Sequence, residues 1–168
     1  MIKNARFWIE KLQLEPHPEG GYFKETYRSG TRIPPQCLPE KYSGDRNSAT
    51  SIYFLLDRFQ FSSFHILKSD ELWFYQYGDA VQIYMLNDQD GLQTITLGPD
   101  PDQQQRLQVI IPAGTAFGAD VINNSSFSLM GCVVTPGFTF NDFELLSRDF
   151  LLNKYPRHKD LIIRLTKK

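Results

Sequence analysis

The 168-residue chain lacks the features that mark several large functional classes. No stretch reaches the ~18 consecutive apolar residues of a membrane-spanning helix, and the first residues contain no apolar run of signal-peptide length. Its 18 basic and 19 acidic residues give a net charge of -1, so no charge excess favours nucleic acid or an anionic membrane as a partner. We therefore expect a cytoplasmic protein with no nucleic-acid partner and no membrane partner.

Cysteine is also scarce. Cys37 and Cys132 are far apart and form no C-x-x-C pair, which excludes both a disulfide framework and a cysteine zinc pattern. Cys132 lies in the apolar run 128–134, and this position predicts a buried thiol.

Aromatic residues, in contrast, make up 14% of the chain, with 13 Phe and 8 Tyr. So many rings have to be buried in a core, in a pocket or between subunits. The length suits one domain with a sizeable core. We expect a single domain over residues 1–168, with a barrel core at about 20–138, a helix at about 4–14 and a helical cap at about 141–165.

Short runs of β-type residues recur through the middle of the chain, and turn signals separate them. The predicted strands are 51–56, 61–67, 72–77, 81–86, 92–97, 107–111 and 128–134. Apolar spacing near three and four predicts the N-terminal helix and one or two C-terminal helices, at 142–152 and 158–165. The proline-containing stretch 29–48 predicts a long irregular excursion. The pattern as a whole indicates an all-β sandwich or barrel.

The candidate site lies on two of these strands. Alternate side chains of a strand share a face, so an inward His65 has Ser63 on its face, and Glu71 shares its face with Trp73 and Tyr75. A carboxylate inside a barrel is costly unless it is paired, hydrogen-bonded or solvated, so an inward Glu71 would indicate a functional cavity. In the other register Glu71 is an ordinary surface charge, and the aromatic side chains fill a core or an interface.

A second distinctive run covers residues 17–29. His17-Pro18-Glu19 precedes two glycines that permit close backbone approach, or that merely turn the chain. In the strand that follows, alternation assigns side chains to two faces: Glu25 and Tyr27 to one, and Tyr22, Lys24 and Arg28 to the other.

Several segments, taken in order, carry a resemblance to a known family. They are 17–29, Phe64-His65, 69–73, 97–100, Pro112-Ala113-Gly114 and the stretch from Gly131 to Glu144. From about Leu12 to Leu165 the chain resembles the cupin superfamily, and within it the uncharacterised cupin 5 group of RmlC-like proteins. The resemblance implies a double-stranded β-helix, that is a jelly-roll or cupin barrel, with a short N-terminal helix, a central pocket and a homodimeric assembly.

The resemblance also implies that half of the usual cupin metal ligands are missing. His65 and Glu71 match ligand positions, but Leu67 and Phe117 stand where the pattern has its other two histidines. Neither of these side chains has a lone pair, and a transition metal needs three or four protein donors to bind tightly. Phe117 also stands where the cupin 5 group commonly has Gln, and Phe74 where it commonly has His, so the pocket is less polar. We expect no metal and no cofactor.

We therefore expect a cupin-fold protein that binds a small polar or carbohydrate-like molecule in the barrel pocket. One alternative is a metal-independent sugar or nucleotide-sugar isomerase or epimerase, with His65 as base and Tyr75 or Tyr22 returning the proton. A second alternative is a non-catalytic storage or scaffold barrel with a filled core. The predicted catalytic residues are His65, Glu71 and Tyr75. The predicted ligand-binding residues are Tyr22, Glu25, Ser63, His65, Glu71, Trp73, Tyr75 and Phe117.

Overall fold

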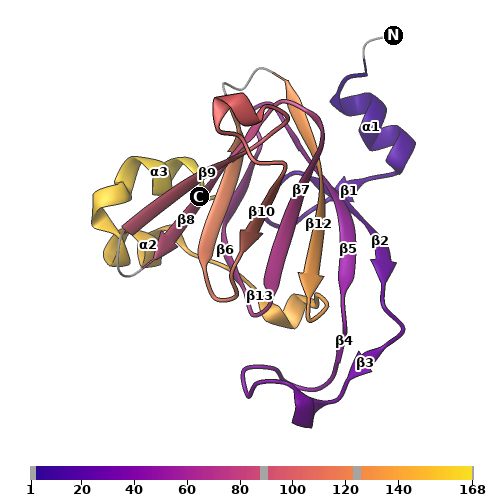
Figure 1. Ribbon diagram of the computed structural model, residues 1–168. Coiled ribbons are helices and arrows are strands. Elements are labelled where there is room, and N and C mark those ends of the chain that lie inside the picture. Colours follow the sequence, from indigo (N-terminus) through magenta and orange to yellow (C-terminus); the bar gives the residue numbers. More distant parts are fainter. Residues whose placement is uncertain (1–2, 88–90, 123–125, 168) are drawn as a thin grey trace.

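The computed structural model describes residues 3–87, 91–122 and 126–167, and its main framework is two antiparallel sheets that face each other (Figure 1). The first sheet contains, in spatial order, β1 (Glu15–Pro16), β2 (Tyr22–Arg28), β5 (Thr50–Asp57), β12 (Phe127–Thr135), β7 (Asp70–Gly78) and β10 (Gln108–Ile111). The second contains β13 (Phe143–Leu145), β6 (Phe61–Leu67), β11 (Ala116–Val121), β8 (Val81–Asn87) and β9 (Gly91–Leu97). This arrangement confirms the predicted all-β jelly-roll barrel.

One central strand was not among the predicted ones. β11 lies between β6 and β8, and every one of its residues is buried. Because both of its faces are covered, its sequence has no polar and apolar alternation to signal a strand. Gly118 is needed there, since a Cβ at this position would lie 2.9 Å from the carbonyl oxygen of Ser62.

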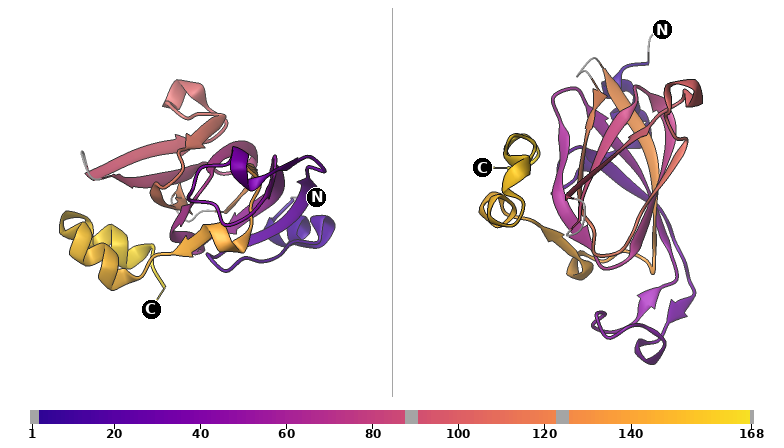
Figure 2. Two further views of the ribbon diagram at one scale, coloured as in Figure 1. Left: turned by 90° about the horizontal axis from the view of Figure 1, so that it is seen from below. Right: turned by 60° about the vertical axis from the view of Figure 1, so that its left-hand side comes forward.

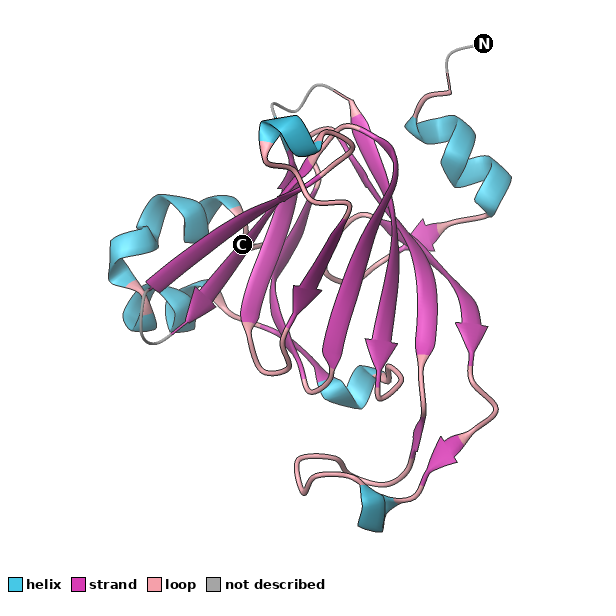
Figure 3. Cartoon of the chain, in the orientation of Figure 1, coloured by secondary structure: helices cyan, strands magenta, loops and turns pink. Residues whose placement is uncertain are grey.

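In the described part of the chain, three short α-helices cover the outside of the barrel (Figure 3). They are α1 (Ala5–Leu12), α2 (Arg148–Lys154) and α3 (Lys159–Arg164). Short 3-10 helices occur at η1 (Pro35–Cys37), η2 (Pro101–Gln103), η4 (Phe140–Asp142) and η5 (Pro156–His158). None of the helices in the described ranges is long and apolar enough to cross a bilayer.

The helices lie on opposite sides of the barrel. α1 packs through Trp8 and Leu12 against Leu55 and Phe127 of the first sheet, whereas α2 and α3 lie on the far side, against the second sheet (Figures 1 and 2). The prediction that a helix begins near 142 is wrong. Residues 143–145 instead pair with β6, and α2 begins only after Ser147, whose hydroxyl accepts a hydrogen bond from the Phe150 N–H.

The excursion at 29–48 extends beyond the end of the barrel (Figures 1 and 2). It contains a two-stranded sheet of β3 (Arg32–Ile33) and β4 (Arg46–Asn47). Arg46 ties it to the barrel through two contacts with Asp142, one of them from Nη2 to Oδ1 at 2.8 Å. Tyr42 adds a hydrogen bond from its hydroxyl to the Lys68 carbonyl oxygen. The excursion is therefore held beside the mouth of the barrel.

The space between the sheets is filled unevenly. Near Val81, Ile83, Val109 and Val121 a continuous apolar core closes the barrel. At the other end, where β5 and β7 begin and β6 and β12 finish, the side chains leave a cavity.

Candidate functional site

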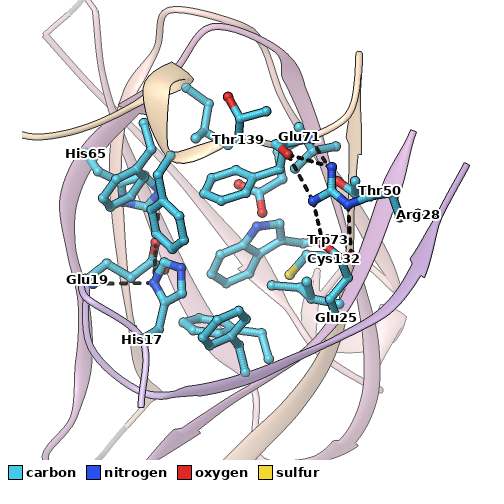
Figure 4. Close-up of a pocket in the computed structure, with 18 residues that line it drawn as sticks. His17, Glu19, Glu25, Arg28, Thr50, His65, Glu71, Trp73, Cys132 and Thr139 are labelled. Carbon is cyan, nitrogen blue, oxygen red and sulfur yellow. Dashed lines mark hydrogen bonds and ion pairs between the residues drawn. The ribbon is translucent and has the colours of Figure 1, made fainter. Parts of the chain in front are cut away.

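The cavity has a volume of about 310 Å³, which is at the lower end of the ~300–1,000 Å³ of small-molecule sites. Aromatic rings from several elements form most of its walls. They are Phe23, Phe54, Trp73, Phe138, Phe140 and Phe143. In Figure 4, His17, Glu19 and His65 lie on one side, Glu25 and Arg28 lie on the other, and Trp73 lies between them.

A buried carboxylate with two histidines forms the first polar group. Glu19 Oε2 lies 3.3 Å from His17 Nδ1 and 3.4 Å from His65 Nε2, and Glu19 Oε1 accepts a 2.7 Å hydrogen bond from the Ser62 hydroxyl. Burial alone would raise the pKa of the Glu19 carboxyl, but the charge of His65 and the contacts with His17 and Ser62 outweigh it, and the pKa lies below its ordinary value. Glu19 is therefore ionised.

The two glycines of the 17–29 run make this cluster possible. Gly20 has φ +122°, and a Cβ there would lie 2.1 Å from the Phe61 carbonyl oxygen. A Cβ on Gly21 would lie 2.6 Å from the Leu55 carbonyl oxygen. The turn between β1 and β2 can thus lie directly against β5 and β6, which brings the Glu19 side chain to His65.

The His65 ring is fixed on three sides. Its Nδ1 lies 2.7 Å from the Ser63 carbonyl oxygen, so this nitrogen carries a proton, and its Nε2 faces Glu19. The ring packs on Phe117 with 4.1 Å between the ring centroids.

Glu71 and Trp73, both on β7, form the second polar group of the cavity. Glu71 is 6% exposed and forms no ion pair within the described parts of the chain. Its carboxyl interacts with the Trp73 N–H and the Cys132 thiol, but the contact with Trp73 falls short of hydrogen-bond geometry. Burial, together with the charge of Glu19, raises its pKa to about 8, although Trp73 and Cys132 oppose the rise. Burial also raises the pKa of the Cys132 thiol. At neutral pH Glu71 is therefore mainly a neutral acid, and Cys132 is a thiol.

Trp73 contributes a hydrogen-bond donor without an acceptor. The side chain is 1% exposed, and its Nε1 finds no partner among the described residues. Figure 4 draws the indole inside the cavity beside Cys132. A buried N–H without an acceptor is costly, so this atom marks a place where a ligand atom would fit.

An ion pair lies at the mouth. Arg28 donates from Nε to Glu25 Oε1 at 2.9 Å and from Nη2 to Glu25 Oε2 at 2.6 Å, and it also reaches the Phe138 carbonyl oxygen at 3.2 Å. The predicted alternation in this strand, with Glu25 and Arg28 on opposite faces, is wrong. An extra residue in β2 between Glu25 and Tyr27 shifts the register with β5, and both side chains face the cavity.

The structure brings four of the predicted site residues together around the cavity: Glu25, His65, Glu71 and Trp73. The other four lie elsewhere, and their assigned roles stay predictions. Tyr22 packs on the α1 side of the first sheet. The Tyr75 hydroxyl donates to the Gly78 carbonyl oxygen at 2.7 Å. Ser63 contributes its backbone, and Phe117 lies behind His65.

Sequence reasoning missed five polar residues that line the cavity: His17, Glu19, Arg28, Thr50 and Thr139. His17, Glu19 and Arg28 all lie in the 17–29 run, which was singled out but was not assigned to the pocket. The run's unusual composition was the available signal. The Phe138–Phe143 segment was missed as well, because nothing in its sequence indicates that it closes over the cavity.

The donor set does not fit a tightly bound transition metal. Leu67 lines the cavity where the cupin pattern has a histidine, and Phe117 packs on the His65 ring. Within the described residues no group of three histidine, cysteine or acidic side chains is arranged to hold a metal ion.

Comparison with known proteins places the chain in a family. The model of the Cupin superfamily (DUF985) matches residues 6–146, which confirms the cupin 5 resemblance. The Uncharacterized protein YML079W of Saccharomyces cerevisiae is 32% identical over 148 residues, which are 82% of this chain and 73% of that protein.

Solved structures agree with this assignment. Protein SO0799 from Shewanella oneidensis is 41% identical, with a TM-score of 0.89 over 99% of both chains. A hypothetical protein from Leishmania major is 32% identical, with a TM-score of 0.88 over 98% of this chain and 99% of its own. A variant of Bacillus subtilis oxalate decarboxylase is 13% identical with a TM-score of 0.55, over 91% of this chain and 38% of that one; this likeness concerns the fold alone.

Proposed function

The chain belongs to the Cupin superfamily (DUF985), and from this premise we propose that it binds a small polar molecule in the cavity between its sheets. The observation that carries the proposal is a pair of buried polar side chains on β7 that line the cavity. The Trp73 N–H has no acceptor in hydrogen-bond geometry among the described residues, and the Glu71 carboxyl beside it forms no ion pair there. Unsatisfied polar groups of this kind are costly in a core, and a ligand would satisfy them.

The shape of the site supports this role over that of a scaffold barrel. A scaffold needs no space in its core, whereas this barrel leaves about 310 Å³ open. Aromatic walls with a few convergent polar groups are typical of small-molecule sites.

Thermal unfolding in the presence of a compound panel tests the proposal. The panel holds sugars, nucleotide sugars, organic acids and nitrogen heterocycles, and the control is Leu67→Trp, which places a bulky ring in the cavity. A ligand at about 100 times its dissociation constant stabilises the folded state by about 2.7 kcal/mol. We expect one class to stabilise the wild type and not the Leu67→Trp variant. No stabilisation by any class, or equal stabilisation of both proteins, would overturn the proposal.

A second candidate function is metal-independent isomerisation or epimerisation with His65 as base. The observation in its favour is that the pKa values of two carboxyls in the cavity change in opposite directions. The pKa of Glu19 is lowered, whereas the pKa of Glu71 is raised to about 8, and such a separation is typical of sites that hold both an acid and a base. Glu71, rather than Tyr75 or Tyr22, is then the acid that returns the proton. Deuterium incorporation into a bound ligand in heavy water, abolished in His65→Gln, supports this function; incorporation that survives in His65→Gln removes the assignment.

We also keep two expectations from the sequence as proposals, a cytoplasmic location and a homodimer. The sheet edges support the second. Among the described strands, β10 pairs with β7 alone. Ile110 in β10 and Leu107, just before the strand, are each 57% exposed. Dimers commonly cover such edges.

A further inference from the structure

The two histidines that line the cavity differ in the hydrogen-bonding capacity that they leave free. Both ring nitrogens of His65 face protein oxygens: the Ser63 carbonyl oxygen lies 2.7 Å from Nδ1, and Glu19 Oε2 lies 3.4 Å from Nε2. The His65 ring also packs on Phe117, with 4.1 Å between the ring centroids. His65 could therefore meet a ligand through a ring nitrogen only by giving up one of these contacts.

His17 uses one ring nitrogen and leaves the other free. Its Nδ1 lies 3.3 Å from Glu19 Oε2 and 3.4 Å from the Glu19 backbone nitrogen. In the described parts of the chain, no hydrogen bond or ion pair involves His17 Nε2. The two nitrogens of an imidazole lie on different edges of the ring, so Nε2 points away from Glu19. In Figure 4 Glu19 lies on one side of the His17 ring and the cavity on the other.

The position of the His17 ring is set by a turn and by aromatic neighbours. The His17 N–H donates to the Gly21 carbonyl oxygen at 3.0 Å, and the Gly20 N–H donates to the His17 carbonyl oxygen at 3.0 Å. The ring meets Phe23 edge to face with 4.6 Å between the centroids and stacks on Phe140 at 6.1 Å. Only 7% of the side chain is exposed. A ligand that meets Nε2 therefore does not have to order this side chain first.

Glu19 holds the opposite edge of the ring. Its Oε2 faces both histidines, and its Oε1 accepts a 2.7 Å hydrogen bond from the Ser62 hydroxyl. A carboxylate that engages one nitrogen of an imidazole fixes the direction in which the other nitrogen points, and proteins orient functional histidines in this way. The carboxylate, the ring and the cavity follow one another in this order.

We propose that His17 contacts the bound molecule through Nε2, and that Glu19 is a positioning residue that fixes the His17 ring. The ligand atom at this contact is an oxygen or nitrogen that exchanges a hydrogen bond with the imidazole, because the aromatic rings around Nε2 offer it no such partner. This proposal rests on the proposed function and assigns a ligand contact within the same cavity.

A long-range nitrogen–proton NMR spectrum of the histidine rings tests the proposal on the full chain. The chain has three histidines, and His158, on η5, lies outside the cavity lining and serves as the reference. Glucose, UDP-glucose, citrate and uracil represent the four classes of the thermal panel. We expect a compound that stabilises the protein to shift the His17 Nε2 signal and to leave the His158 signals in place.

Two replacements separate the roles of the two His17 nitrogens. The amide nitrogen of asparagine lies near the position of Nδ1 and leaves nothing at Nε2, whereas that of glutamine reaches the position of Nε2. In calorimetric titration with the stabilising compound, His17→Asn should bind about tenfold more weakly than the wild type, because a hydrogen bond to a buried group is lost. His17→Gln should lose less affinity, and His158→Asn should bind as the wild type does.

The positioning role has its own measurement. Glu19→Gln keeps the shape of the side chain and removes its charge, so it should shift the His17 Nδ1 signal before any compound is added. An unchanged Nδ1 signal would show that Glu19 does not hold the ring.

The outcomes separate this proposal from the proposed function. A stabilising compound that moves the Trp73 indole signal but no His17 signal, or that binds His17→Asn as tightly as the wild type, overturns the proposal and leaves the proposed function standing. Stabilisation by no compound of any class overturns both. The spectrum of the wild type decides the matter even where a variant fails to fold.

Discussion

Replacing Glu71 with glutamine should change how the stability of the protein depends on pH. The ordinary pKa of this carboxyl is 4.5, and in the folded protein it is about 8. Between these two values the folded state holds a proton that the unfolded state has released. The stability of the wild type therefore falls as pH rises through this window, and the loss is complete above the folded pKa.

The size of the effect follows from the difference between the two pKa values. One pKa unit corresponds to about 1.4 kcal/mol, so a change from 4.5 to about 8 corresponds to about 5 kcal/mol. Glutamine has nearly the same shape and no charge. The Glu71→Gln variant should thus equal the wild type near pH 4.5 and exceed its stability by up to about 5 kcal/mol above pH 8.

Urea unfolding monitored by tryptophan fluorescence, repeated from about pH 5 to about pH 9, measures this difference. All other groups titrate in both proteins, so their contributions cancel when the two free energies of unfolding are subtracted. Glu144→Gln, at an exposed position on β13, should differ from the wild type by the same small amount at every pH. A difference between Glu71→Gln and the wild type that stays constant with pH would refute the reasoning, because it would mean that Glu71 is not buried as a neutral acid.

Three further predictions concern stability and assembly. Arg46→Ala leaves the buried Asp142 with Lys68 at 3.6 Å and the Thr139 hydroxyl at 3.3 Å, and should lower the free energy of unfolding in urea by about 3 kcal/mol. Arg32→Ala, which breaks an exposed pair, should cost under about 1 kcal/mol, and equal losses would contradict this account. Gly20→Ala should lower the melting temperature markedly, because the new Cβ would clash with the Phe61 carbonyl oxygen. Gly30→Ala is the control and should not lower it, because a Cβ at this position has no atom within 4 Å. Equal melting temperatures for the two variants would contradict the described position of the turn between β1 and β2. Light scattering at micromolar concentration should give about twice the chain mass of 19.5 kDa; a mass near 19.5 kDa would reject the homodimer.

Local sequence patterns predicted most of the barrel. Alternation and turn residues located β5, β6 and β7 to within a few residues, since each of these strands has polar or glycine-rich ends. β11 was not predicted because its residues are buried on both faces, which leaves no polar and apolar alternation. The start of α2 was misplaced because pairing of residues 143–145 with β6 overrides their helical spacing.

The faces of the site strands were harder to predict, because β-bulges interrupt the alternation. In β6 an extra residue between Ser62 and His65 shifts the register with β11, and it is the Ser62 hydroxyl, not that of Ser63, that reaches Glu19. A similar extra residue in β2 brings Arg28 to the cavity. Such bulges depend on how distant strands pair, and a single strand's sequence does not reveal them.

The indole N–H signals in a two-dimensional nitrogen–proton NMR spectrum test the central claim most directly. The chain has two tryptophans, both with a buried Nε1 that lacks an acceptor in the described residues, and only Trp73 lines the cavity. Trp8→Phe assigns the two signals, and Trp8 then serves as the internal reference. A compound that stabilises the protein should shift the Trp73 signal and leave the Trp8 signal in place. A stabilising compound that leaves the Trp73 signal unmoved would contradict the account, because its binding site would then lie outside the barrel cavity.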